Sequence, residues 1–342
     1  MLSIFIEFVF NVVLFLCCFA ASLLAVGVVY IKFRYKTLSR TTLKNKHVVI
    51  TGGSSGIGKG VACEAAKRGA NVTIIARDKI KLVAAKNEIA KHCVNSSQRI
   101  HTYSLDVSSN FDKVDKAFVE IEQEVGPIYM LVNCAGSAVC GKLEDLSKAD
   151  IKKMFDLNCL GSIFPTKAVI EGMKARGEGY IVFVASQAAQ IGIFGLSAYS
   201  ASKFALRGFA EALNMEVKAH GIKVTISFPP DTDTPGFAEE EKSKPKETRL
   251  ISQTSGLYSP AEIALKLMND TLAGYFISSY NFEGFMMYVL CAGMSPYSSF
   301  FHLLLESLLM GIFRIVGGAY LISFDRIVMR CMKEKNHSKK AE

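Results

Sequence analysis

The sequence lacks the cysteine and histidine spacing that metal sites require. Its nine cysteines are scattered, with no Cys-x-x-Cys pair and no histidine partner at ligand spacing, so we expect no metal. The odd count suits a reducing compartment. Charge is also scarce, at 21% of residues with a mean hydropathy of +0.26, which excludes a disordered or fibrous protein. Internal repeats and low-complexity tracts are absent as well.

Acidic residues are missing from one strongly basic segment. Residues 32–46 carry six basic and no acidic side chains, and residues 326–342 carry six basic and two acidic ones. With Glu7, these segments account for the whole net charge of +9, so residues 47–325 are neutral overall. Basic flanks beside apolar runs favour a membrane surface over a nucleic-acid groove, and we expect no nucleic-acid partner.

Charged residues are also absent from Phe8 to Ile31, a run of 24 residues. As a helix it would be about 36 Å long, against a hydrocarbon core of about 30 Å. A cleaved signal peptide has basic residues before a shorter apolar stretch, whereas here Glu7 precedes the run and the bases follow it. We predict a retained transmembrane anchor over 1–31 and a basic linker over 32–45, with the domain behind them in the cytosol.

Short β-branched runs alternate with helical periodicity from residue 46 to about 275. Strands are predicted at 47–50, 72–75, 129–132, 180–184 and 224–226, and helices at 57–69, 78–92, 110–125, 148–175 and 200–220. This alternation predicts an α/β fold, a Rossmann-type doubly wound parallel sheet in a single catalytic domain over 46–283. A loop is predicted at 230–248.

The chain becomes apolar again over 284–324, which predicts a membrane-associated region. A membrane hairpin, an interfacial amphipathic helix and an apolar lid on the soluble domain remain open. Residues 325–342 form a basic tail whose last four residues, Lys339 to Glu342, match the dilysine pattern of endoplasmic reticulum membrane proteins. Such a signal must face the cytosol, which requires none or two crossings between the domain and the tail.

A glycine-rich loop follows the first predicted strand. It reads Thr51-Gly52-Gly53-Ser54-Ser55-Gly56-Ile57-Gly58 and leads into a helix. Gly52 permits a sharp turn, Gly56 permits close approach of a pyrophosphate, and Gly58 permits tight helix packing. On the first strand-to-helix turn of an alternating sheet, this loop indicates a dinucleotide site.

An acidic residue is missing where NAD-binding sheets place one, at the end of the second strand. Ala76 and Arg77 stand there instead. Without a carboxylate nothing repels a 2′-phosphate, and an arginine can bind one in a bidentate manner, so NADPH is the expected cofactor.

Tyr199 and Lys203 are four residues apart on one helix face, and Ser186 ends the preceding strand. A tyrosine has a pKa near 10 and needs a nearby cation to act as an acid–base group, which Lys203 can supply. Ser186 can orient a carbonyl oxygen, and Asn158 can hold a water that links the lysine to solvent.

These motifs resemble those of the short-chain dehydrogenase/reductase family. The resemblance covers 46–275 and adds Asp106, with Val107, on the adenine side and the Asn133-Cys134-Ala135-Gly136 motif of strand four. It implies a cofactor site formed by the glycine loop with Ser54, Ser55 and Ile57, by Arg77, Asp106, Val107, Asn133, Ala135 and Gly136, and by Tyr199 and Lys203. It also implies a catalytic tetrad of Asn158, Ser186, Tyr199 and Lys203. Members often form homo-oligomers through the helices that hold Asn158 and Tyr199.

The run from Phe228 to Leu250 narrows this resemblance, because it has Pro229-Pro230 where the wider family has Pro-Gly. It resembles a membrane-bound branch that reduces a long-chain 3-keto sphingoid base with NADPH at the cytosolic face of the endoplasmic reticulum. Ser186 and Tyr199 would then bind the ketone, and Asp231 or Asp233 the ammonium beside it. The alternatives are a membrane-bound hydroxysteroid or retinal dehydrogenase and a non-catalytic NADPH-binding scaffold.

Overall fold

The computed structural model describes residue 22, residues 42–253 and residues 256–341. The predicted anchor over 1–31, apart from Ser22, and residues 32–41 of the predicted linker lie outside the described residues. The side chains beyond Lys335, including those of the Lys339–Lys340 pair, are outside them too.

The centre of the domain is a parallel sheet of seven strands in the order β3-β2-β1-β4-β5-β6-β7. This order confirms the predicted Rossmann-type sheet. From β1 the chain adds strands first toward one edge of the sheet (β2, β3) and then toward the other (β4 to β7). The carboxyl ends of β1 and β4, where the direction changes, form a crevice for ligands. The strands are β1 (His47–Thr51), β2 (Asn71–Ala76), β3 (Ile100–Ser104), β4 (Ile128–Asn133), β5 (Gly179–Val184), β6 (Ile222–Phe228) and β7 (Ile277–Ser279).

Two of these strands, β3 and β7, were not predicted from the sequence. Both lie at edges of the sheet. β3 is only partly buried and mixes polar with apolar residues, and β7 has just three residues. Neither therefore has the continuous apolar run that marks a buried parallel strand.

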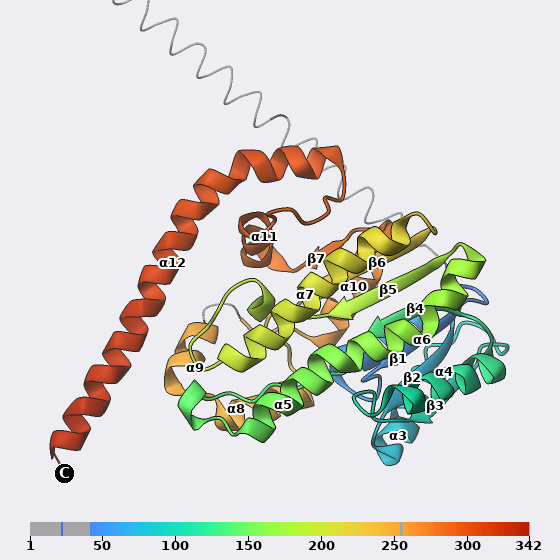
Figure 1. The fold of residues 1–342 in the computed structure, drawn as a ribbon, viewed down its shortest axis with the longest axis horizontal. Coiled ribbons are helices and arrows are strands. Elements are labelled where there is room, and N and C mark those ends of the chain that lie inside the picture. The colour runs from blue at the N-terminus through green and yellow to red at the C-terminus, as the bar shows by residue number, and fades with distance from the viewer. Residues whose placement is uncertain (1–21, 23–41, 254–255, 342) are drawn as a thin grey trace, which may run out of the picture. The chain divides into compact units, whose positions relative to one another are not determined.

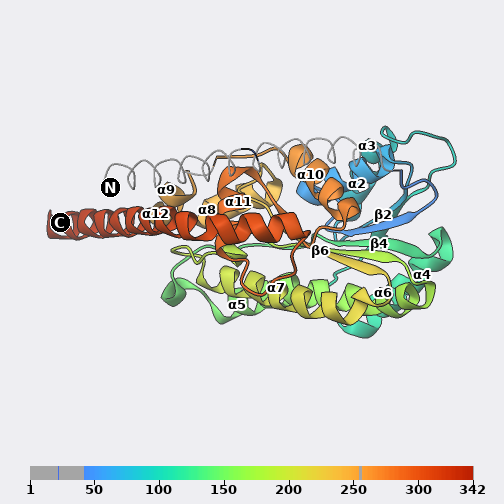
Figure 2. The same ribbon diagram turned by 90° about the horizontal axis from the view of Figure 1, so that it is seen from above.

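Helices cover both faces of the sheet (Figure 2). α2, α3 and α10 lie on one face, and α4, α6 and α7 lie on the other. Large buried side chains such as Phe118, Phe183 and Phe228 fill the core between the layers. The helices are α2 (Gly56–Lys67), α3 (Lys79–Ala90), α4 (Phe111–Val125), α5 (Lys148–Phe155), α6 (Gly161–Arg176), α7 (Ser197–Lys218) and α10 (Pro260–Ala273).

The prediction of a loop at 230–248 was wrong, because this segment contains α8 (Pro235–Ser243) and the start of α9 (Lys246–Ser252). Thr234 begins α8 by accepting a hydrogen bond from the Phe237 backbone N–H at 3.0 Å, and Pro235 occupies the first turn. A threonine cap followed by proline is a common way to begin a helix. The segment was predicted as a loop because it is rich in proline and charged residues.

The C-terminal region consists of α11 (Asn281–Leu290), a loop that contains Pro296, and one continuous helix, α12 (Phe300–Ala341) (Figure 1). The hairpin considered for 284–324 is not present, and α12 continues through the expected boundary at 324, since no proline interrupts it. Among the described residues, the one helix long and apolar enough to cross a membrane is Phe300–Lys335.

α12 nevertheless contacts the rest of the domain at several points. Phe313 is buried in the main core, where its ring meets Phe282 and Phe285 edge-on at 5.8 and 6.0 Å. Further along the helix, Cys331 is buried and Lys335 forms an ion pair of 2.7 Å with Glu247 of α9. The helix is therefore part of the wall of the domain.

Candidate active site

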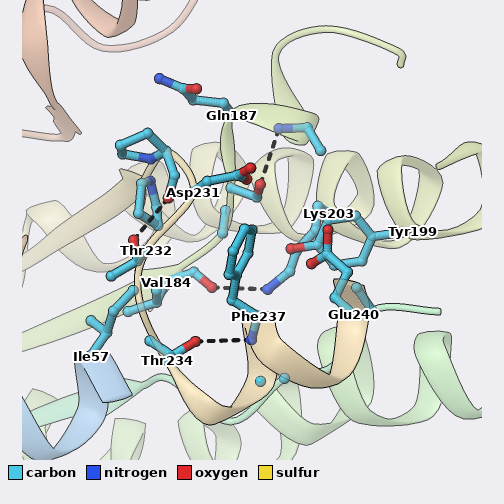
Figure 3. Close-up of a pocket in the computed structure, with 18 of the residues that line it drawn as sticks. Ile57, Val184, Gln187, Tyr199, Lys203, Asp231, Thr232, Thr234, Phe237 and Glu240 are labelled. Carbon is cyan, nitrogen blue, oxygen red and sulfur yellow. Dashed lines mark hydrogen bonds between the residues drawn. The ribbon is translucent and has the colours of Figure 1, made fainter. Parts of the chain in front are cut away.

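A cavity of about 750 Å³ lies at the carboxyl ends of the strands and collects most of the predicted site residues (Figure 3). It extends from Arg77, next to β2, to Phe324 on α12. The predicted residues that line it are Gly52, Ser54, Ser55, Gly56, Ile57, Gly58, Arg77, Asp106, Val107, Ala135, Gly136, Ser186, Tyr199, Lys203 and Asp231.

The glycine loop has the geometry that its sequence predicts. Gly52 and Gly56 have φ of +67° and +52°, a region that side chains disfavour. A Cβ on Gly58 would lie 2.4 Å from the carbonyl oxygen of Gly52, and one on Gly56 would lie 2.8 Å from the Thr234 methyl group. Glycine therefore keeps the loop close to the start of α2 and to the wall of the cavity.

The start of α2 is suited to a phosphate group. Ser55 precedes the helix without using its side chain as a cap, and the first turn contains no acidic residue. Backbone N–H groups at this end therefore remain available for an anion, which the helix dipole also favours. The residues present thus fit the pyrophosphate of a dinucleotide.

Two cations, Arg77 and Lys81, line the end of the cavity next to β2, and Asp78 and Asp106 line it as well. Lys81 lies in the first turn of α3, 4.0 Å from the Asp78 carboxylate. The Asp78 carboxylate accepts hydrogen bonds from the backbone N–H groups of Ile80 and Lys81 at 2.9 and 3.0 Å, so it caps α3. This pair of cations fits a 2′-phosphate.

Asp106 also lines this end, close enough to Arg77 for the two charges to interact. Its carboxylate accepts hydrogen bonds from the Ser108 backbone at 3.0 Å and from the Ser108 hydroxyl at 2.6 Å. Partial burial opposes ionisation, but these bonds and the charge of Arg77 keep the pKa of Asp106 below its usual value. It is therefore a fixed anion that can accept hydrogen bonds from a ligand at this end of the cavity.

Ser186, Tyr199 and Lys203 come together in the middle of the cavity. The Lys203 ammonium is buried and donates a hydrogen bond of 3.0 Å to the carbonyl of Val184 at the end of β5. It lies 5.9 Å from the centre of the Tyr199 ring. The Ser186 hydroxyl accepts a hydrogen bond from the Ala188 N–H at 3.1 Å and forms another with the Tyr199 phenol.

The expected lowering of the Tyr199 pKa by Lys203 is not present. Removal of water from the phenol raises its pKa most, the carboxylates of Glu240 and Asp231 raise it further, and the bond from Ser186 lowers it only in part. Burial also lowers the pKa of Lys203 to about 8. At neutral pH Tyr199 is therefore protonated and able to donate its proton.

Asn158, the fourth tetrad residue, lies behind the cavity wall. It belongs to a π-helical turn, Asp156–Leu160, which interrupts the helix predicted at 148–175. Its amide donates to the Ser137 carbonyl and to the Ser202 hydroxyl, both at 3.0 Å, and accepts the Ser137 N–H at 2.9 Å. A Cβ on Gly136 would lie 3.1 Å from Asn158 Oδ1 and 3.4 Å from Lys203 Nζ, so both flank this glycine.

Besides Asn158, two predicted site residues do not line the cavity. Asn133 is buried at the end of β4, where it donates to the Thr166 hydroxyl at 3.0 Å. Asp233 is exposed. Both were expected to contact a ligand because of their place in the sequence, but their side chains lie apart from the cavity lining.

Glu240 lines the cavity instead, although no sequence pattern separates it from its acidic neighbours. Its side chain is close enough to Tyr199 to raise the pKa of the phenol (Figure 3). With Asp231 it contacts the buried ammonium of Lys244, at 3.2 and 3.6 Å respectively. Only the turn of α8 distinguishes Glu240 from Glu239, whose side chain is exposed.

Lys81 was also missed. An apolar lid on the domain was among the interpretations left open for 284–324, but the residues of α11 and α12 that line the cavity were not singled out. Lys81 lies in the first turn of the helix that follows Arg77, and this closeness in the sequence was an available signal. For α12 no such signal existed, because the helix is apolar on several faces.

Known proteins resemble this chain over most of its length. The family model for short chain dehydrogenase matches residues 46–245. A 3-dehydrosphinganine reductase of Danio rerio is 50% identical over 300 residues, which cover 88% of this chain and 90% of that protein. A 3-ketodihydrosphingosine reductase of Mus musculus is 48% identical, with 86% and 88% covered.

Solved structures agree on the fold. An alcohol dehydrogenase of the archaeon Thermococcus sibiricus, complexed with 5-hydroxy-NADP, superimposes with a TM-score of 0.56 at 26% identity. The match covers 65% of this chain and 88% of that one. Together with the glycine loop and the Ser186, Tyr199 and Lys203 arrangement, these matches show that the chain belongs to the short-chain dehydrogenase family.

Proposed function

We propose that this protein is an NADPH-dependent reductase of 3-ketodihydrosphingosine, which it converts to dihydrosphingosine in sphingolipid synthesis. The observation that carries this proposal is 50% identity to a 3-dehydrosphinganine reductase over nearly its whole length. The arrangement of Ser186, Tyr199 and Lys203 around one cavity supports ketone reduction. All residues of the family's catalytic set are present in this chain, which disfavours a scaffold that binds the cofactor without turnover.

The cofactor assignment rests on the charged end of the cavity. Arg77 and Lys81 line it, while Asp78 is engaged as a helix cap. The Thermococcus sibiricus relative was solved with an NADP derivative, which agrees with this choice. We assign the 2′-phosphate to Arg77 and Lys81, the pyrophosphate to the start of α2, and the adenine side to Asp106 and Val107.

The chain's own residues would then act as follows. Bound NADPH supplies hydride to the ketone carbon. Ser186 donates a hydrogen bond to the ketone oxygen, and Tyr199 gives its proton to that oxygen. Lys203 holds the nicotinamide ribose and connects Tyr199 to a proton path that Asn158 positions.

The ammonium group beside the ketone requires a negative partner. Asp231 and Glu240 line the cavity near Tyr199, and burial raises the pKa of both carboxyl groups. The buried Lys244 ammonium contacts both of them and Glu241, and Arg249 also pairs with Glu241. Three carboxylates therefore face two cations, and we assign the substrate ammonium to the remaining negative charge beside Asp231 and Glu240. Asp233, which is exposed, takes no part in the assignment.

We further propose that the protein acts at the endoplasmic reticulum membrane with its domain facing the cytosol. The predicted anchor over 1–31, the basic segment over 32–46 and the dilysine pattern of the last four residues support this location. Exposed apolar side chains on the helices of the tetrad, including Phe204 and Met215 on α7, support a homo-oligomer through that face.

A substrate comparison tests the proposal. Oxidation of NADPH by the full-length protein in detergent is followed with a 3-keto sphingoid base, a steroid ketone and a retinal. We expect turnover of the sphingoid base, and Tyr199→Phe should bind NADPH normally while its turnover falls by about 10²–10⁴-fold. Preference for the steroid or the retinal would reject the substrate, and absence of turnover with all three would reject the enzyme.

A further inference from the structure

The cavity continues beyond the catalytic residues to the C-terminal helices. α11 contributes Met286, Met287 and Leu290 to its wall, and α12 contributes Gly317, Leu321 and Phe324. Glu283, Arg314 and Tyr320 add polar groups to this otherwise apolar part. A helix that composition alone would assign to the membrane thus also bounds the active-site cavity.

One stripe of α12 faces the cavity. Its lining positions, 314, 317, 320, 321 and 324, recur at intervals of three or four residues, which places them on one side of the helix. Over these positions the stripe is about 15 Å long, at 1.5 Å of rise per residue. It can therefore contact a ligand along an extended length.

The remaining surface of α12 is also apolar but is exposed to the outside. Ile312, Ile315 and Ile322 are 61%, 78% and 54% exposed, and none of them lines the cavity. A helix that is apolar all round is normally covered by protein or lipid. The part of the chain that the structure describes does not cover these side chains, and the helix is long and apolar enough to enter a bilayer.

We propose that α11 and α12 form the passage through which a long alkyl chain moves from the bilayer to Tyr199. Lipid covers the outer surface of α12, and the chain of the ketone lies along the inner stripe. This inference rests on the proposed function, since it takes the substrate to be a long-chain ketone. It makes α12 a determinant of chain-length specificity in addition to a membrane contact.

Gly317 and Gly318 offer a matched pair of positions. A Cβ on Gly317 would lie 3.0 Å from Leu290 Cδ1, at the place where α11 and α12 meet beside the cavity. A Cβ on Gly318 would meet no atom within 4 Å. Gly317→Leu should therefore obstruct the passage, whereas Gly318→Leu adds the same side chain on the outer surface.

The experiment compares these variants with the unaltered full-length protein in phosphatidylcholine vesicles. The substrates are a long-chain 3-keto sphingoid base and a short-chain, water-soluble analogue. We expect kcat/KM of Gly317→Leu to fall by about tenfold or more for the long-chain ketone and to stay unchanged for the analogue. Gly318→Leu should leave both values unchanged.

A second pair covers the case in which Gly317→Leu does not fold. Leu321→Asn places an amide in the passage, and Ile322→Asn places one on the outer surface, so only the first should impair the long-chain substrate selectively. Equal losses on both substrates, or no loss from either inner variant, would overturn the passage. Failure of the unaltered protein to reduce any keto base would instead overturn the proposed function.

Discussion

Removing the guanidinium of Arg77 should weaken NADPH binding without affecting NADH. Arg77 and Lys81 line the same end of the cavity, and the side chain of Arg77 is exposed. Hydrogen bonds to charged groups contribute about 1.5–3 kcal/mol, and exposure places Arg77 at the lower end of this range. A loss of about 1.5 kcal/mol corresponds to an increase of about tenfold in KM for NADPH.

Initial rates at a fixed concentration of the keto base, with NADPH or NADH varied, measure this effect. Arg77→Ala should raise KM for NADPH about tenfold, and Arg77→Ala with Lys81→Ala about 10²-fold if the two contacts are independent. Lys79→Ala is the control, because Lys79 is exposed on the same helix as Lys81 but does not line the cavity. Equal changes for both coenzymes, or none for NADPH, would refute the assignment of the 2′-phosphate to this end.

Two further predictions concern pH. Burial lowers the pKa of His47 to about 4, so the unfolded state binds a proton first as pH falls below 6.5, and about 3 kcal/mol of stability is lost by the time pH falls below 4. The free energy of unfolding, measured with urea at neutral pH and near pH 4.5, should show this loss, and His47→Gln should make the loss smaller. A loss of unchanged size in that variant would contradict the assignment to His47. Burial also lowers the pKa of Lys203 to about 8, so the lysine loses its charge above that value and kcat/KM for ketone reduction should fall. A pH–rate profile that stays flat to pH 9.5 would rule out a requirement for charged Lys203.

The cofactor loop could be predicted because its chemistry is local. Gly52, Gly56 and Gly58 are needed for contacts within a few residues, and the following helix start is visible in the sequence. Tyr199 and Lys203 were predictable for the same reason, since four residues on a helix define one face. The central strands were predictable because their runs are continuously apolar.

Features that depend on distant parts of the chain could not be predicted in this way. Glu240 becomes a cavity residue only because α8 turns it toward Tyr199, while Asp233, two residues after Asp231, remains outside. The interior position of Asn158 depends on a π-helical turn that no pattern announces. The inner stripe of α12 depends on which side of an apolar helix meets α11, and apolar periodicity does not distinguish these sides.

The burial of Tyr199 favours reduction of a ketone over oxidation of an alcohol. Oxidation of an alcohol would require the phenolate as a base, but removal of water and the nearby Glu240 carboxylate both favour the neutral phenol. Reduction requires a proton donor, which the neutral phenol is. Lys244 already pairs with Asp231 and Glu240, and an ammonium bound beside this cluster would offset its remaining negative charge as the ketone arrives. The phenol would then release its proton more easily. A ketone without that ammonium should therefore be reduced more slowly even when its chain fits the passage.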